Sequence, residues 1–128
     1  MKSIANYIQT HADALNLRAK RNEILASNIV NSATPNFKAR DIDFNKALQA
    51  RMDVGPVNVS NERHFKFYTG SGDEAAQFRQ SINPSVDGNT VELHVEQMQF
   101  SENVMRYQTS LEFLNRKFSG LISAIKGE

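Results

Sequence analysis

The chain has 128 residues, of which 15 are basic and 14 acidic, so its formal net charge is +1, and it contains no cysteine. The two signs of charge alternate along the chain, whereas nucleic-acid-binding proteins carry a basic face or tail. The lack of cysteine excludes disulfides and thiolate chemistry. No stretch reaches the roughly 20 apolar residues that span a bilayer. Polar residues interrupt the first 20 positions, so we expect no cleaved secretory signal.

Residues 1–34 carry a heptad pattern and are predicted to form an N-terminal assembly helix, helical over residues 3–32. Alternating steps of four and three from Met1 meet apolar residues at every position except Asn22. Alanine fills nearly every other position, which lets a partner helix approach closely, and the single Asn is of the kind that fixes register. The expected closest contacts are Ala12, Ala19 and Ala26. The predicted packing residues are Ile8, Ala12, Leu15, Ala19, Asn22, Ala26 and Ile29.

The central region, residues 35–88, is predicted to be irregular and partly extended. Pro35 ends the first helix, and Asn36 tolerates the left-handed conformation of a type II turn. We expect an extended segment over residues 37–44 and a helical turn over 45–52. A small hairpin is predicted from the alternating runs 57–59 and 65–67, followed by an irregular linker over residues 70–90.

Residues 89–128 are predicted to form the C-terminal assembly helix, helical over residues 90–126 and about 55 Å long. Asn89 is a predicted N-cap, with Glu92 completing something close to a capping box. The predicted packing residues are Leu93, Phe100, Val104, Tyr107, Leu111, Leu114, Phe118, Leu121 and Ile125. Further apolar residues widen this face beyond what one partner helix covers, which indicates an association surface. A closed intramolecular helical hairpin is the alternative.

Together these segments predict a mainly α protein. Its two long terminal helices form an antiparallel coiled-coil-like layer, and a small irregular or β region lies between them in sequence.

The sequence offers no catalytic or metal-binding pattern. His11, His64 and His94 are far apart and have no cysteine near them, so no metal site is expected. Asp41 and Asp43 alternate along an extended segment, which favours a polar face over a carboxylate pair. No phosphate loop or nucleophile motif is present. We therefore predict a protein that is not an enzyme, with no catalytic residues and no cofactor.

The densest basic cluster comprises Arg18, Lys20 and Arg21. It has two interpretations at this stage, a solvated helix face or an ionic contact to a neighbouring subunit.

The segment from residue 16 to residue 38 resembles the N-terminal signature of bacterial flagellar rod and hook proteins. That signature is an amphipathic helix that runs into a pattern like Asn-Ile-Ala-Asn-x-x-Thr-Pro-Gly-Tyr-Lys. Val30 and Asn36 depart from that signature, and Asn is the next-best residue after Gly for positive φ. The residues of the family turn motif in this chain are Asn28, Asn31, Thr34, Pro35, Asn36 and Phe37.

Four further segments, 40–44, 87–91, 106–108 and 114–118, are similar to the short proximal-rod members of that family. The resemblance implies a structural subunit of the periplasm-spanning basal-body rod, part of the axial drive shaft and export channel, secreted by the flagellar type III apparatus without a cleaved signal peptide. The implied partners are copies of itself, other rod proteins, the basal adaptor FliE and the MS-ring and export-gate proteins, with no nucleic acid and no direct membrane insertion. Two alternatives stay open: another short rod protein of the same family, and a soluble coiled-coil adaptor or export chaperone.

Overall fold

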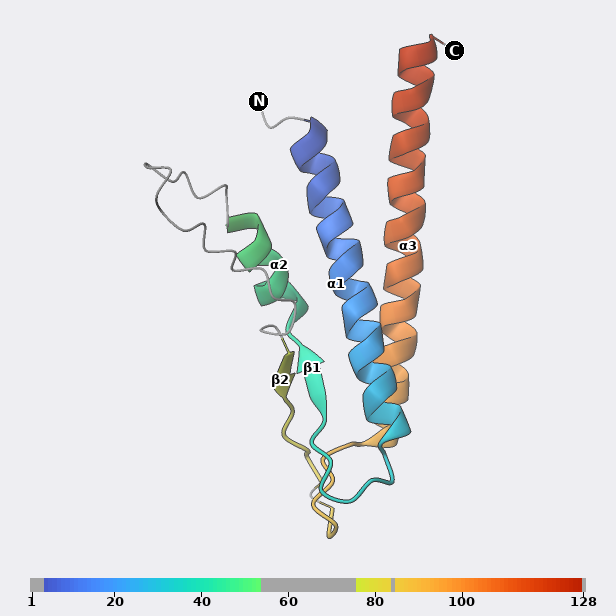
Figure 1. Ribbon diagram of the computed structural model, residues 1–128. Coiled ribbons are helices and arrows are strands. Elements are labelled where there is room, and N and C mark those ends of the chain that lie inside the picture. Colours follow the sequence, from blue (N-terminus) through green and yellow to red (C-terminus); the bar gives the residue numbers. More distant parts are fainter. Residues whose placement is uncertain (1–3, 54–75, 84, 128) are drawn as a thin grey trace, which may run out of the picture.

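The computed structural model describes residues 4–53, 76–83 and 85–127. Two long helices run antiparallel, with the beginning of α1 and the end of α3 at the same end of the molecule (Figure 1). The central elements lie along α1 on the side away from α3. The predicted fold class, mainly α with long terminal helices and a small β region, is confirmed. In chain order the elements are α1 (Ile4–Val30), β1 (Arg40–Ile42), α2 (Phe44–Asp53), β2 (Ala76–Phe78) and α3 (Leu93–Lys126).

The first helix ends at Val30, two residues before the predicted end. The Asn31 side chain donates to the Ser27 carbonyl at 2.8 Å and so closes the last turn. A tight turn follows, in which the Phe37 N–H donates to the Thr34 carbonyl at 3.3 Å. Asn36 has a φ of 59°, the left-handed conformation predicted for it.

The second long helix begins at Leu93 rather than at residue 90, and the prediction that Asn89 is its N-cap is wrong. Glu92 takes the N-cap position and makes no side-chain capping bond. Asn89 is turned instead toward the end of α1, where backbone carbonyls without helical partners accept its amide hydrogens. At the other end Gly127 adopts φ 77° and its N–H donates to the Ser123 carbonyl, as is usual for a helix C-terminus.

The two strands pair antiparallel, with Asp41 opposite Gln77. The extended segment predicted over residues 37–44 contains β1, and the predicted helical turn after it is α2. The prediction of an irregular linker over residues 70–90 is wrong for residues 76–78, which form β2. Three residues are too few to carry an alternating pattern, so only the distant partner β1 makes them a strand. The hairpin predicted over residues 57–67 lies outside the described residues.

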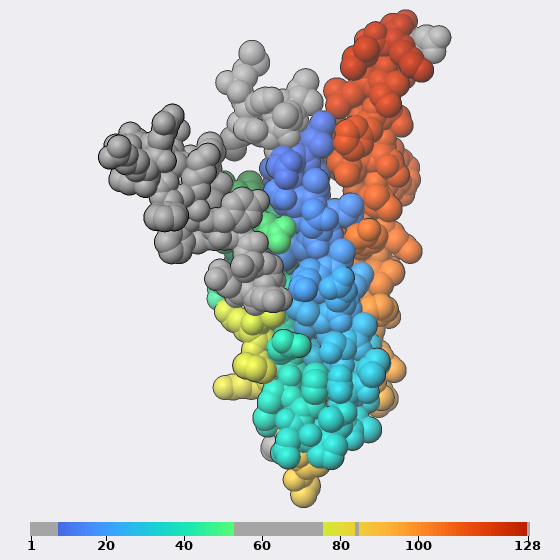
Figure 2. Space-filling model, in the orientation of Figure 1, coloured from blue at the N-terminus to red at the C-terminus, as the bar shows by residue number. Residues whose placement is uncertain are grey.

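A small apolar core joins α1 to the central elements. Leu17 and Ile24 on α1 pack against Ile42, with Phe44 and Leu48 covering the cluster. Figure 2 shows the elongated body that results, with the end of α3 extending past the beginning of α1. Within the described ranges, no helix is long and apolar enough to cross a membrane.

Candidate assembly interface

The centre of the α1–α3 contact is polar. Asn103 is 1% exposed and donates from Nδ2 to the Arg18 carbonyl at 2.9 Å and to Asn22 Oδ1 at 2.8 Å. Nearer the base of the helix pair, Asn28 donates to Glu96 Oε2 at 3.0 Å, and both side chains are 1% exposed. Buried polar groups of this kind hold two helices only when each finds a partner.

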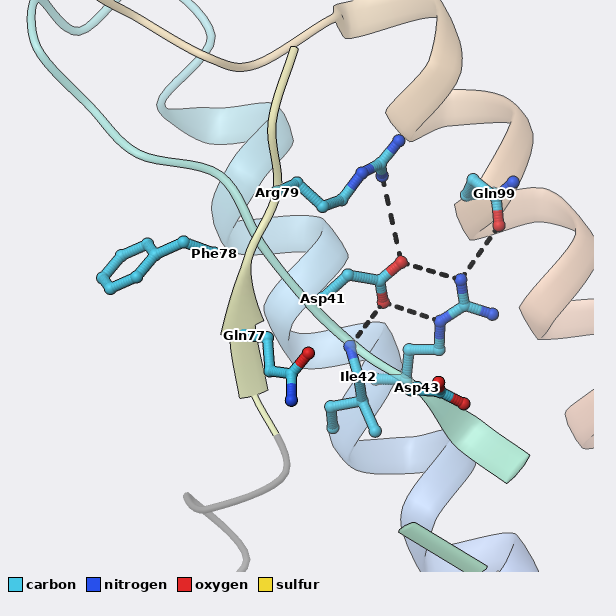
Figure 3. Close-up of a pocket in the computed structure, with 8 residues that line it drawn as sticks. Asp41, Ile42, Asp43, Gln77, Phe78, Arg79 and Gln99 are labelled. Carbon is cyan, nitrogen blue, oxygen red and sulfur yellow. Dashed lines mark hydrogen bonds and ion pairs between the residues drawn. The ribbon is translucent and has the colours of Figure 1, made fainter. Parts of the chain in front are cut away.

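Hydrogen bonds extend from this centre into the sheet. Arg79 on the chain after β2 donates to Glu96 Oε1 at 3.0 Å. Arg21 on α1 grips both oxygens of Asp41 at 2.8 and 2.9 Å and reaches Gln99 on α3 at 2.9 Å (Figure 3). The hydrogen bond to Asp41 raises the pKa of the Arg21 guanidinium. Of these residues, Arg21, Asp41, Arg79 and Gln99 line an open pocket. Together the hydrogen bonds join α1, α3 and the sheet into one unit.

Asn28 also closes the edge of β1. Its Nδ2 donates to the Arg40 carbonyl at 2.7 Å, and its Oδ1 accepts the Arg40 N–H at 3.1 Å. The Asn28 amide thereby makes the two hydrogen bonds to β1 that a neighbouring strand would make. The same side chain also donates to Glu96. This residue of the family turn motif thus ties α1 to both β1 and α3.

Two members of the basic cluster make contacts within the chain, which neither interpretation anticipated. Arg21 pairs with Asp41, and the Arg18 guanidinium lies 4.1 Å from the centre of the Phe44 ring. Burial lowers the pKa of Arg18, and the nearby Arg106 and Arg21 charges lower it further. Lys20 lies 3.7 Å from Glu23 on the surface of the same helix.

The acidic and histidine residues have structural surroundings. Asp43 precedes α2 and accepts the Lys46 N–H at 3.2 Å, which lowers its pKa. The His11 ring lies 5.1 Å from that of Phe113 across the two helices. His94 is exposed, and His64 falls outside the described residues. In the part of the chain that the structure describes, no three metal-binding side chains come together.

Asn22 is the predicted packing residue that takes part in this polar centre, and most of the others lie on its flank. On α1 all seven are half-buried, and the fully buried positions are others, Leu17, Ile24, Leu25 and Asn28. On α3 the half-buried predicted residues are Phe100, Val104, Tyr107, Leu114 and Leu121. The exposed predicted residues are Leu93, Leu111, Phe118 and Ile125.

Helical geometry places both apolar stripes on one face of the pair. Ala19 follows Leu17 by two residues, about 200° around the helix, so it is turned away from the core and the sheet. Ala26 stands in the same relation to Ile24. On α3, Leu111 and Gln99 lie on opposite flanks of Asn103. Gln99 is on the side of the sheet, because it accepts a hydrogen bond from Arg21, which binds Asp41. An apolar face therefore lies opposite the sheet.

The base of the helix pair is closed by a clamp centred on Asn89, which is 4% exposed. Its Nδ2 lies 3.0, 2.9 and 3.0 Å from the carbonyls of Asn31, Ser32 and Thr34. Gly88 has a φ of 75°, a conformation that favours glycine, and a Cβ there would lie 2.6 Å from Asn36 Oδ1, so a larger residue would displace the Asn36 side chain. The family turn and the chain before α3 therefore fit closely together.

Comparison with known proteins agrees with this architecture. Residues 8–38, most of α1 and the turn, match the family model for the flagella basal body rod protein. A flagellar basal body rod protein FlgB from Cereibacter sphaeroides is 50% identical over 128 residues, which is 100% of both chains. The FlgB of Aeromonas hydrophila is 46% identical over 92% of this chain and 91% of its own. The FlgB of Escherichia coli K12 is 37% identical over 89% and 88%.

This chain belongs to the FlgB family.

It is therefore a structural subunit of the flagellar basal-body rod, and the resemblance drawn from the turn motif is confirmed. Within this FlgB chain, the sequence-based predictions did not include Glu96 and Asn103 in the helix pair, and they gave Asn89, at its base, the different role of an N-cap. A signal was present, because Glu96, Asn103 and Ser110 recur every seven residues on one line of α3. Because these residues are polar, apolar spacing does not mark that line.

Asp87 in the clamp gives the FlgB subunit a pH-dependent contribution to stability. The hydroxyl of Ser85, the Asn89 N–H and the Lys38 charge lower its pKa. A depressed pKa stabilises the fold above the unfolded value of about 4 and loses that effect as the pH falls through the folded value. We expect acid unfolding curves of the wild type and Asp87→Asn to differ at neutral pH and to converge below about pH 4. Curves that stay parallel throughout acidification contradict this assignment.

Proposed function

We propose that this subunit polymerises through the apolar face of its α1–α3 layer, so that copies and other rod proteins form the axial drive shaft and its export channel. The observation that carries the proposal is the row of large apolar side chains left exposed on α3. Leu111 is 37%, Phe118 43% and Ile122 52% exposed. A continuous exposed apolar face marks an interaction site, and a helix is the partner that fits a helical face.

The alanine row of α1 supports the same proposal. Ala12, Ala19 and Ala26 recur every seven residues beside the α3 stripe, and small side chains let a neighbouring helix pack at short distance. In this arrangement residues 1–34 and 89–128 are the assembly segments. The sheet and α2 lie on the opposite side of the pair, which faces outward in this arrangement.

We also propose the location and neighbours that the resemblance to the rod proteins implies. The rod crosses the periplasm, and the subunit is exported without a cleaved signal peptide. Its neighbours at the base are the adaptor FliE and the MS-ring and export-gate proteins. A soluble adaptor or chaperone is less well supported, because the relatives that match the full chain carry the name of a rod protein.

Ala19→Leu tests the proposed face. The added side chain occupies the space that a partner helix needs, since overpacking a close contact is not absorbed by small shifts. We expect normal expression and helix content but loss of swimming in a strain that carries only this variant, with the subunit absent from isolated basal bodies.

Ala50→Leu is the matched control, because it makes the same change at an exposed position on α2, outside the helix pair. This variant should swim normally. Full motility of the Ala19→Leu strain sinks the assignment of this face.

A further inference from the structure

The centre of the α1–α3 contact is polar, and the proposed assembly through the apolar face does not explain why. Asn103 occupies the middle of the α1–α3 contact, at 1% exposure, where an apolar side chain packs well in most helix pairs. Its hydrogen bonds to Asn22 Oδ1 and the Arg18 carbonyl cross from one helix to the other.

This arrangement is poorly suited to maximal stability. Asn103 Oδ1 and Arg18 Nε are buried and have no hydrogen-bond partner among the described residues. Unpaired polar atoms in a helix interface weaken the contact, and apolar side chains of similar size stabilise such sites. The apolar residues that could fill the centre are present, but they lie on the flank.

We infer that the Asn22–Asn103 pair is a specificity determinant that keeps α1 paired with α3 of the same chain. Asn103 is buried and its bond to the half-buried Asn22 forms only in one register and one orientation, so the pair penalises every other pairing of the same helices. If a second copy presented its α3 shifted by seven residues, Asn103 would face Leu15 or Ile29 in place of Asn22. In both cases the bond to the Asn22 side chain is lost.

A subunit whose helices expose apolar stripes has particular need of such a device. The stripes are free to pair with other copies in many registers before assembly, because apolar contacts are not directional. The Asn pair restricts that freedom at the intrachain contact and leaves the apolar face for ordered neighbours. The role of the Asn pair in ordered assembly rests on the proposed function. Its effect on whether α1 pairs with α3 of the same chain or of another copy does not.

The test measures that choice in the purified full chain. Since the chain has no cysteine, His11→Cys with Phe113→Cys introduces a unique pair at positions whose rings lie 5.1 Å apart. A short bis-maleimide then gives monomeric products from intrachain pairing and dimeric products from interchain pairing, which separate on a denaturing gel.

In this background we compare Asn22→Leu/Asn103→Leu with Ser110→Leu. Ser110 lies on the same line of α3, but its hydroxyl bonds to the Arg106 carbonyl of its own helix. We expect the double variant to melt about 5 °C higher and to form about tenfold more interchain product, whereas Ser110→Leu stays within about twofold of wild type.

If the double variant forms no more interchain product than wild type, the inference is overturned. It is also overturned if Ser110→Leu raises the interchain product equally, because added apolar surface alone then explains the rise. If the leucines prevent folding, the Asn22→Ala/Asn103→Ala variant replaces them, and the ratio of intrachain to interchain product is measured in the same way. A motile Ala19→Leu strain contradicts the proposed assembly face but does not change the ratio of intrachain to interchain product. The failure of the proposed function and the failure of this inference are therefore distinguishable.

Discussion

Arg79→Ala is expected to lower the free energy of unfolding by about 3 kcal/mol, because it leaves a buried carboxylate without its counter-charge. Glu96 is 1% exposed, and its Oε1 accepts from Arg79 at 3.0 Å. The remaining donor, Asn28, satisfies only the other oxygen. Urea unfolding followed by circular dichroism measures the change, and a loss below about 1 kcal/mol contradicts it.

A double-mutant cycle separates the charge from the packing. Glu96→Gln in the Arg79→Ala background removes the unpaired charge but keeps the volume and an acceptor for Asn28. We expect this second change to restore about half of the lost stability. Arg116→Ala is a matched control, since Arg116 pairs with Glu112 on the surface of α3 and such pairs contribute little.

Asn89→Ala is expected to cost about 2–3 kcal/mol, because it removes the donor shared by three carbonyls at the end of α1. It also removes the Oδ1 that accepts the Val91 N–H at 2.8 Å and so closes an Asx turn before α3. The loss should be visible both in thermal unfolding and in faster amide exchange over residues 31–38.

Asn89→Asp sharpens this prediction. A carboxylate keeps the acceptor for Val91 but places a negative charge beside carbonyl oxygens, so this variant should be no more stable than Asn89→Ala. Asn115→Ala, at an exposed position on α3, should leave stability within about 0.5 kcal/mol. Wild-type stability of Asn89→Asp rules out the clamp.

The terminal helices could be predicted from sequence because their signals are local. Periodicity over some 30 residues locates each helix, and Pro35 with Asn36 marks the turn between α1 and the central region. The left-handed Asn36 follows from its own side chain and its proline neighbour, and needs no distant contact.

The parts that could not be predicted depend on distant partners. Asn89 reads as an N-cap from its neighbours, yet the carbonyls that it binds lie more than 50 residues earlier in the chain. The strand β2 exists only because β1 pairs with it. Glu96 and Asn103 are polar residues on a helix, which normally face water, and only the position of α1 makes them buried.

The clamp at one end of the helix pair has a mechanical consequence. The turn, the Asn89 hydrogen bonds and the sheet all act near the end of α1 and the beginning of α3, and Figure 1 shows the helices separating toward the opposite end. Because a helix of 27 residues is about 40 Å long, tilting it by about 5° at the base moves its far end by roughly 3–4 Å. In the proposed assembly such a tilt would let one subunit meet neighbours at different spacings while its base keeps a fixed shape.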